Sequence, residues 1–482
     1  MINFCITNSD HIKKDNFDHK ISLGNNTVLY HDSMVEIKDL SKHLIAFCGI
    51  LWEGQIEDFT DSDRQNGQFY AVVFNKQSNT VKVISDFLED FPVYYHIKDG
   101  KFAITNSLLA FSNTLEIDEK WIGLAQSGNY TDRLIQPCEG IATDKYLTDN
   151  ITPIKDVKRL GPGRVMEIQL GTGKMNTYSW YDAGSDYVAP IFAEPIYNME
   201  SAKDLVDKVL RQNALTLTEK YGSRLAMFAS NGVDSLTLIK YLEEVPKYGY
   251  YGKDYMNESP ELLRRLYENT GGTLHYFDED EYRLAYSETI RGWKTPSFNM
   301  DLAPEMHIRD RYNLKDKVIV KGTFGDEIFW HDARSAMSVA VHDWRITGME
   351  EIIHSLKERY SRQLFHMTQH NLDNIIKSRN FEVSIMNYHY NRQRSYLKDD
   401  RVLLDQMIIS PFIDLRLREL LPKCDKQTQT ASILDASIQT QLMGKNLKQY
   451  MNKYKAGGEE SFEEIGYSKQ QRKQLEEFIK SR

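Results

Sequence analysis

The chain contains few cysteines and has neither a long apolar run nor an excess of basic residues. Only four of its 482 residues are cysteine, namely Cys5, Cys48, Cys138 and Cys424, and none forms a Cys-x-x-Cys pair. This spacing argues against a zinc ribbon and against a disulfide framework. It is typical of a protein in a reducing compartment, so we expect a cytoplasmic location.

Two further absences narrow the range of partners. No apolar stretch reaches the about 20 residues that a membrane-spanning helix needs, and the N-terminus lacks the charged-then-apolar pattern of a secretory signal. The net charge of −9 gives no general attraction to nucleic acid or to an anionic membrane. We therefore expect neither nucleic acid nor a membrane as a partner. The net charge of the whole chain does not exclude a local basic groove.

The composition is that of an ordinary soluble protein with several domains. Hydrophobic residues make up 41% and charged residues 27% of the chain, and its length favours two or three domains. We predict a domain over residues 1–190, a second over 200–460 and a charged C-terminal tail over 461–482.

Residues 1 to about 185 are rich in strand patterns. Apolar and β-branched runs alternate with turn residues such as Lys98-Asp-Gly100. The predicted strands are His43–Ile50, Phe69–Phe74, Val81–Ile84, Val93–His96 and Lys101–Ile104, and a further hairpin is expected between Leu160 and Gly173.

From Leu225 onward strands alternate with helices, which predicts a parallel sheet and an α/β fold. A proline-containing linker is expected over Ala189–Ser201, followed by an amphipathic helix over Ala202–Lys220. The predicted parallel strands are Leu225–Ala229, Lys247–Tyr251, Thr273–Phe277 and Lys317–Lys321, and beyond Asp332 the pattern is almost entirely helical.

The stretch Leu225-Ala-Met-Phe-Ala-Ser-Asn-Gly-Val-Asp-Ser235 is the most informative in the chain. A buried strand runs into a turn with glycine at the start of a helix, where backbone N–H groups converge and bind phosphate. The Gly-Lys-[Ser/Thr] of a Walker loop is missing. The turn resembles the Ser-Gly-Gly-x-Asp-Ser loop of ATP pyrophosphatases, with Asn231 in place of the first glycine.

A second motif follows the strand at Lys317. Lys317-Val-Ile-Val-Lys-Gly-Thr-Phe-Gly-Asp-Glu-Ile-Phe329 again ends a strand in a turn with glycine and paired acids. A doubly wound sheet places its ligand at such strand ends. Asp234 and Asp326 are therefore candidate ligands of a Mg²⁺ ion that bridges the phosphates of ATP.

This second motif resembles the Ser-Gly-x-Gly-x-Asp-Glu-x-Phe segment of the asparagine synthetase superfamily, which includes β-lactam synthetases and lasso-peptide cyclases. Gly322, Asp326, Glu327 and Phe329 match, whereas Lys321, Thr323 and Phe324 do not. Further segments in the same order also resemble that superfamily, namely Asn66–Phe74, Val83–Asp86, Pro92–Tyr95, Lys101–Ser107, Ser410–Leu415 and Lys453–Gly457.

The resemblance implies a fold of two parts. An α+β glutaminase-like sandwich domain precedes a doubly wound, parallel-sheet ATP-pyrophosphatase domain with a helical C-terminal part. The glutaminase domain of the family uses an N-terminal cysteine, but residue 2 here is Ile and Cys5 fits a buried structural thiol. Cys48 replaces the oxyanion amide of the family, so we expect this domain to be inactive.

The resemblance also implies the reaction and its residues. A substrate carboxylate would be adenylated by ATP with Mg²⁺, and an amine from a source other than glutamine would then displace AMP, either within one molecule or between two. Lys455, Asp326 and Glu327 would be catalytic. Ser230, Asn231, Gly232, Asp234, Ser235 and Gly322 would bind ATP, and Asp234 and Asp326 would hold the metal.

Each candidate residue also has a structural alternative. Asp234, Ser230 and Ser235 are residues that cap helices, and acids such as Asp326 and Glu327 favour the start of a helix. Without the family spacing, a surface lysine in a polar loop is the better interpretation of Lys455, and the spacing favours a function. Among the remaining polar residues, His275, Asp86 and Asp414 are expected to be structural.

Three alternative functions stay open at this stage. One is an asparagine synthetase that uses free ammonia. Another is a different pyrophosphatase chemistry such as tRNA thiolation, although no cysteine lies between Ser223 and Arg334. The third is a degenerate, non-catalytic binding protein. The substrate is expected to be a small molecule or peptide with a carboxylate and an amine, and the oligomeric state stays open.

Overall fold

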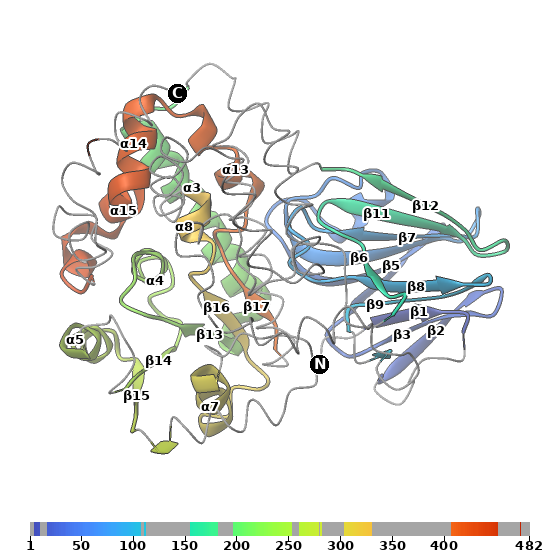
Figure 1. Ribbon diagram of the computed structural model, residues 1–482, viewed down its shortest axis with the longest axis horizontal. Coiled ribbons are helices and arrows are strands. Elements are labelled where there is room, and N and C mark those ends of the chain that lie inside the picture. Colours follow the sequence, from blue (N-terminus) through green and yellow to red (C-terminus); the bar gives the residue numbers. More distant parts are fainter. Residues whose placement is uncertain are drawn as a thin grey trace, which may run out of the picture.

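Two antiparallel six-stranded sheets pack face to face in the N-terminal part of the chain (Figure 1). The computed structural model describes residues 4–9, 17–107, 110–111, 155–181, 196–252, 260–278, 280–281, 303–329, 406–451 and 473. We call the two N-terminal sheets the sandwich.

The first sheet has the order β10-β8-β9-β1-β3-β2. Its strands are β1 (Phe4–Thr7), β2 (His19–Gly24), β3 (Thr27–His31), β8 (Tyr94–Lys98), β9 (Lys101–Thr105) and β10 (Lys158–Arg159). The turn between β2 and β3 consists of Asn25 and Asn26, which have φ of 49° and 58°. Asn tolerates this left-handed region better than most residues.

The second sheet has the order β12-β11-β7-β6-β5-β4. Its strands are β4 (Glu36–Asp39), β5 (His43–Leu51), β6 (Gly67–Asn75), β7 (Thr80–Ser85), β11 (Arg164–Gln169) and β12 (Lys174–Ser179), and a 3-10 helix, η1 (Ile56–Thr60), lies between β5 and β6. The two sheets meet in an apolar core, where the ring centroids of Phe4 and Tyr70 lie 4.3 Å apart.

Five parallel strands form a separate sheet in the order β15-β14-β13-β16-β17. They are β13 (Leu225–Phe228), β14 (Lys247–Gly252), β15 (Thr273–Phe277), β16 (Val318–Lys321) and β17 (Ile408–Ile409). The chain starts in the middle at β13, moves outward to β15 and returns on the other side at β16. The order therefore reverses between β13 and β16, which defines a topological switch point.

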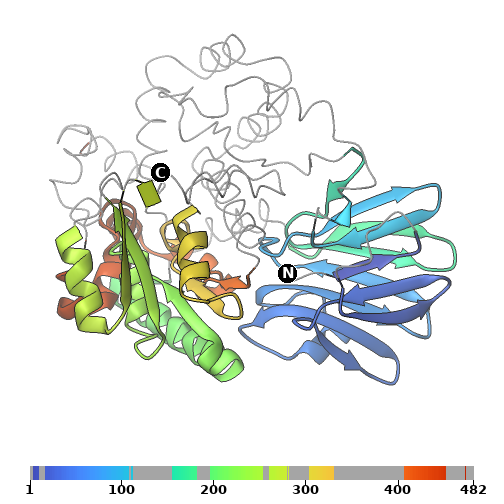
Figure 2. The same cartoon turned by 90° about the horizontal axis from the view of Figure 1, so that it is seen from below.

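Helices cover both faces of this parallel sheet (Figures 1 and 2). On β14, Gly249 faces α5 (Pro260–Thr270), because a Cβ there would lie 2.1 Å from Tyr267 Oη. The adjacent Tyr248 points to the opposite face, where its ring lies 5.6 Å from that of Tyr312, just after α7 (Ala303–Arg311). Side chains alternate along a strand, so α5 and α7 lie on opposite faces.

The remaining helices surround the sheet and its C-terminal neighbours. They are α3 (Met199–Tyr221), η3 (Gly222–Arg224), α4 (Val233–Ile239), α8 (Gly325–Ile328), α13 (Leu415–Arg418), η5 (Leu421–Lys423), α14 (Lys426–Asp435) and α15 (Ser437–Lys448). Asn198 caps α3 by accepting a hydrogen bond from Ser201 N at 3.0 Å.

Polar side chains of the sandwich join it to the segment that follows β17. Gln68 on β6 donates from Nε2 to Ser410 O at 2.6 Å and accepts from Ser410 N at 3.0 Å. Trp52 Nε1 donates to Ile413 O at 2.6 Å. The Ser410–Leu415 segment is therefore held by hydrogen bonds from the other part of the chain.

The α/β class predicted from the sequence is confirmed, and most predicted strands agree with the structure to within one or two residues. Two details were wrong. The helical pattern assigned beyond Asp332 missed β17, and the linker assigned to Ala189–Ser201 ends earlier because α3 begins at Met199. The tail over 461–482 lies outside the described residues except for residue 473.

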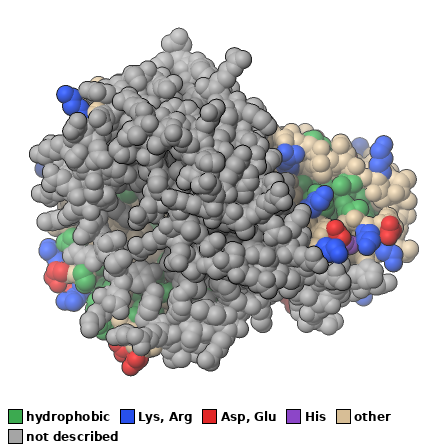
Figure 3. All heavy atoms as spheres, viewed as in Figure 1, with side chains coloured by type: hydrophobic (Ala, Val, Ile, Leu, Met, Phe, Trp, Pro, Cys, Tyr) green, Lys and Arg blue, Asp and Glu red, His purple; other side chains and the backbone are tan. Residues whose placement is uncertain are grey.

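The surface of the described part carries charges of both signs. On the face shown in Figure 3, Lys and Arg side chains of the sandwich lie beside Asp and Glu side chains. Among the described residues, no helix combines the length and the apolar character that crossing a bilayer requires.

Candidate functional site

The turn after β13 lies at the switch point of the parallel sheet, where the sequence predicts phosphate binding. Ser230 and Ser235 approach each other with their Oγ atoms 3.2 Å apart, and Gly232 N donates to Ser230 Oγ at 3.1 Å. Gly232 stands at the N-cap of α4, with φ of −73° and no side-chain cap. Both serines therefore stabilise the turn itself, as expected if their role is structural.

Asp234, in the first turn of α4, packs against the second motif. A Cβ built on Gly325 would lie 2.3 Å from Asp234 Oδ1, and one on Gly322 would lie 3.0 Å from Asp234 Cβ and 2.8 Å from Ser235 N. Any larger residue at Gly322 or Gly325 would push the two turns apart. The structure therefore brings Asp234 and Ser235 together with Gly322, which lies far from them in sequence.

The turn after β16 has an unusual backbone at Phe324. This residue has φ of 76° and is only 1% exposed. In the superfamily motif the corresponding position is a glycine, which adopts positive φ without strain. Phe324 therefore holds a backbone conformation that suits glycine, at a cost of about 1–3 kcal/mol for a non-glycine residue.

Unpaired polar atoms gather around Asp234. Asn231 is fully buried, and neither atom of its amide group has a hydrogen-bond partner. Thr323 Oγ1, in the turn after β16, and Gln439 Oε1, on α15, are also buried without a partner. A buried atom of this kind lowers the free energy of unfolding by about 1–3 kcal/mol, unless a ligand or a water molecule forms a hydrogen bond with it.

Two residues that the sequence did not indicate belong to this site. Gln439 donates from Nε2 to Asp234 Oδ1, and Glu305 on α7 pairs with Lys321 at the end of β16, with Nζ 2.6 Å from Oε2. Both Lys321 and Glu305 are largely buried. Neither Gln439 nor Glu305 belongs to a motif, so no sequence signal marks them.

Ser410 connects the site to the sandwich. Its hydroxyl donates to Thr323 O in the turn after β16, while its backbone exchanges two hydrogen bonds with Gln68. Nearby Asp414 is fully buried and accepts hydrogen bonds from Asn66 at 3.1 Å and Asn213 at 3.0 Å. Asp414 therefore has the structural role that the sequence predicts.

The side chains of the three predicted catalytic residues lie outside the described part of the structure. Asp326 and Glu327 lie within α8, directly after the turn that contacts Asp234, but their side chains lie outside the described part of the structure. Lys455 lies outside the described residues. The catalytic roles of all three, and the metal role of Asp326, stay predictions.

The thiols of the sandwich are both fully buried. Cys5 lies in β1 and Cys48 in β5, each with no exposed surface. Phe47–Ile50, which resembles the oxyanion segment of the family, is paired with β6 along its whole length, and Phe47 is also paired with β4. Tyr221 of α3 donates to Gly49 O at 2.9 Å, so this segment is also held from the second part of the chain.

Comparison with known proteins adds no family assignment. No protein-family model and no curated protein sequence matches this chain.

Proposed function

We propose that this protein is an ATP-dependent, AMP-forming ligase that joins a carboxylate to an amine supplied by a source other than glutamine. The observation that carries the proposal is the packing of Asp234 against Gly322 and Gly325 at the switch point between β13 and β16. Ligands of doubly wound sheets bind at such points. The unpaired amide of Asn231 and hydroxyl of Thr323 provide donors for phosphate oxygens there.

In the first step, a carboxylate oxygen of the substrate forms a bond to the α-phosphorus of ATP. The bond from that phosphorus to the bridging oxygen breaks, and pyrophosphate leaves. In the second step, the amine nitrogen bonds to the carbonyl carbon, AMP leaves with the electron pair of the broken bond, and the nitrogen loses a proton. Backbone N–H groups of the turn after β13 would hold the pyrophosphate.

The donor set of the site fits Mg²⁺, which prefers one or two carboxylates together with phosphate and water. Asp234 would hold the ion, with Asp326 as its second predicted ligand. When bound, Mg²⁺ would offset the negative charge that develops on pyrophosphate. Lys321 and its partner Glu305 border the same strand end and would help to orient the substrate.

The experiment that tests this function is exchange of labelled pyrophosphate into ATP in the presence of Mg²⁺. A panel of amino acids, diacids and small peptides would be compared with wild-type protein, Asp234→Asn and, as a matched control, Asp204→Asn on the exposed surface of α3. We expect exchange that depends on one particular carboxylate. In Asp234→Asn, but not in the control, the exchange rate should fall more than about 100-fold, because the variant loses one electrostatic contact to the transition state.

Two other outcomes of this experiment would favour other functions. Absence of exchange with every carboxylate, together with absence of ATP binding, would favour the non-catalytic binding protein. Phe324 and Asn231, which replace glycines of the superfamily motifs, are the residues consistent with that alternative. Exchange with aspartate followed by use of free ammonia would instead favour an asparagine synthetase.

A further inference from the structure

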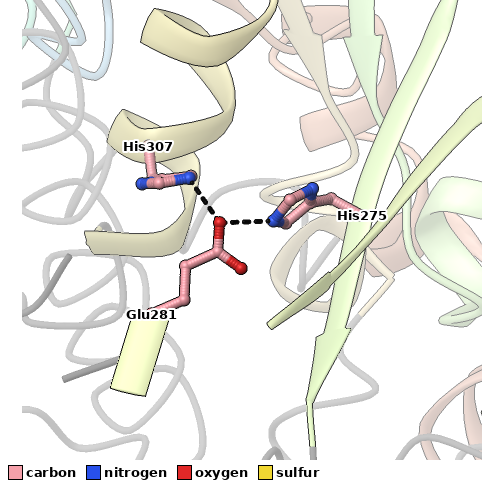
Figure 4. Close-up of side chains that lie close together, drawn as sticks. All are labelled: His275, Glu281 and His307. Carbon is pink, nitrogen blue, oxygen red and sulfur yellow. Dashed lines mark hydrogen bonds and ion pairs between the residues drawn. The ribbon is translucent and has the colours of Figure 1, made fainter. Parts of the chain in front are cut away.

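Three side chains from separate segments converge beside the outer edge of the parallel sheet (Figure 4). His275 lies on the edge strand β15, His307 lies on α7, and Glu281 belongs to the segment that follows β15. Glu281 Oε1 lies 3.1 Å from His275 Nε2 and 3.0 Å from His307 Nε2. The two imidazole nitrogens therefore point at the same carboxylate oxygen.

The contact from His307 is not an ordinary hydrogen bond. His307 Nε2 is buried and has no hydrogen-bond partner of acceptable geometry, although Glu281 Oε1 is only 3.0 Å away. A nitrogen that is shielded from water and misaligned with its neighbour loses the energy of one hydrogen bond. A cation between the nitrogen and the oxygen would satisfy both atoms.

The two nitrogen–oxygen distances in this cluster suit a first-row metal ion. Zn²⁺ binds imidazole nitrogen and carboxylate oxygen at about 2.0–2.2 Å, so its ligand atoms lie about 3.3 Å apart at tetrahedral angles. The two nitrogen–oxygen distances here are within a few tenths of an ångström of that value. The three ligand atoms all lie within 4.8 Å of one another.

A second residue supports the orientation of His275. Tyr312 Oη lies 3.4 Å from His275 Nδ1, the ring nitrogen on the side away from Glu281. When Nε2 binds a metal, Nδ1 carries the proton and donates to an oxygen such as this one, which fixes the tautomer. Ring contacts at 4.7 Å between His275 and Phe277 further restrict the imidazole.

The three side chains of this cluster are partly buried. The side chains of His307 and Glu281 are 22% and 23% exposed, and that of His275 is 9% exposed. Arg311 competes for the carboxylate, with Nη1 3.5 Å from Glu281 Oε1, but its own side chain is 53% exposed and can turn into solvent. A bound divalent ion would displace this cation.

We propose that His275, Glu281 and His307 bind a divalent first-row transition-metal ion, with Zn²⁺ as the best fit and water as the remaining ligand. The nitrogen ligands distinguish this site from the oxygen-based Mg²⁺ site proposed at Asp234. The ion ties β15 to α7, the helix whose Glu305 pairs with Lys321. Its role is therefore to fix α7 against the sheet, independently of the reaction proposed above.

The test uses the full chain, stripped of metal with a chelator and titrated with Zn²⁺ and, for its visible spectrum, with Co²⁺. We expect one tightly bound ion per chain, a Co²⁺ absorption spectrum of a four- or five-coordinate site, and a higher unfolding temperature with Zn²⁺. Glu281→Gln and His307→Ala should each weaken Zn²⁺ binding more than about 100-fold, since outer-shell changes alone reach about 10–100-fold.

Two controls separate this site from general histidine binding. Tyr312→Phe keeps the ring contact with Tyr248 but removes the hydroxyl, and should weaken Zn²⁺ binding about 10-fold. His43→Ala, on β5 of the sandwich, should leave it unchanged. Circular dichroism of the metal-free variants checks folding, and Glu281→Gln, which preserves shape, decides the test if His307→Ala does not fold.

The proposal is overturned if wild-type chain takes up no Zn²⁺ in this titration. It is equally overturned if Glu281→Gln, folded as the wild type, binds Zn²⁺ with unchanged affinity and an unchanged Co²⁺ spectrum.

Discussion

Two buried acids of the sandwich and the turns of the parallel sheet differ in how their polar groups form hydrogen bonds. In the sandwich, fully buried Asp86 accepts hydrogen bonds from the backbone N–H groups of Phe69, Leu88 and Asp90, all at 2.8–3.1 Å. Buried Glu89 pairs with Arg159 at 3.0 Å and accepts from Gly161 N. These acids stabilise the connection between β7 and β8 from within the same sheets.

The turns at the switch point of the parallel sheet are built differently. There Asn231, Thr323 and Gln439 leave buried polar atoms without partners, and Phe324 holds a backbone conformation that suits glycine. Residues that reduce stability without an evident structural gain are expected at functional sites. Asp86 and Glu89 of the sandwich thus form hydrogen bonds with their own surroundings, whereas the switch point has the character of a ligand site.

The largest expected effect concerns the buried ion pair of the sandwich. Glu89→Ala should lower the free energy of unfolding by about 3–5 kcal/mol, because the guanidinium of Arg159 would stay buried without its carboxylate. Denaturant unfolding of the variant measures this loss. Glu167→Ala on β11 is the control and should change stability by less than about 0.5 kcal/mol. A loss below about 1 kcal/mol for Glu89→Ala would contradict the view that the sandwich depends on such internal pairs.

A matched pair of buried asparagines tests the switch point directly. Asn213 is fully buried and fully paired, since it donates to Pro411 O at 2.9 Å and Asp414 Oδ2 at 3.0 Å and accepts from Arg416. Asn231 is equally buried but unpaired. Asn213→Ala should cost about 1–3 kcal/mol, whereas Asn231→Ala should be neutral or stabilise the ligand-free protein by about 1 kcal/mol.

Thermal unfolding with and without ATP and Mg²⁺ measures both variants. If Asn231 binds phosphate, the increase in unfolding temperature caused by ATP should be smaller in Asn231→Ala than in wild type. Equal destabilisation by the two substitutions would show that Asn231 is as well satisfied as Asn213, and would remove the contrast between the switch point and a well-paired buried amide on α3.

The smallest expected effect concerns a polar cluster that fastens α3 to α4. Asp207 Oδ1 lies 2.7 Å from Lys240 Nζ and accepts from Tyr241 Oη at 2.9 Å, while Oδ2 accepts from Arg211 Nε at 2.6 Å. Burial alone would raise the pKa of Asp207, but the hydrogen bonds from Arg211, Lys240 and Tyr241 outweigh it and lower the pKa to about 2.

The sign of the pH dependence follows from this lowered pKa. The contribution of Asp207 is present above its unfolded pKa of about 3.9 and is lost as pH falls through about 2. Asp207→Asn should therefore cost about 1 kcal/mol near neutral pH, after allowance for solvent screening, and almost nothing at pH about 2. Urea unfolding at several pH values measures this. A constant difference between the variants across that range would contradict the assignment.

Much of the fold could be predicted because its signals are local. The turn residues Asp99 and Gly100, both with positive φ, join β8 to β9 where the Lys98-Asp-Gly100 pattern predicts a turn. The predicted start of α3 was wrong because its cap, Asn198, lies in a segment whose proline and polar residues are typical of a linker. Strand β17 has only two residues, which are too few to show the alternation of apolar and polar side chains that predicts a strand.

The candidate site could be predicted only in part. Asp234, Ser235 and Gly322 belong to motifs next to strand ends, and the strand order of the sheet brings those motifs together. Gln439 and Glu305 approach the site from helices distant in sequence, and no local pattern distinguishes them from other polar helix residues. The same holds for His275 and His307, of which only His275 stood out in the sequence, as a structural residue.

The sequence by itself determined most of the strands and the turns next to them, because backbone conformational preferences and side-chain periodicity act over a few neighbouring residues. Only the tertiary structure decided which turns meet, since contact between Asp234 and Gly325 requires β13 and β16 to pair in parallel, with Phe228 beside Lys321. It also decided which polar atoms stay unpaired, as with Asn231 and Asn213. A hydrogen-bond partner depends on where distant segments pack, and no local sequence pattern encodes that position.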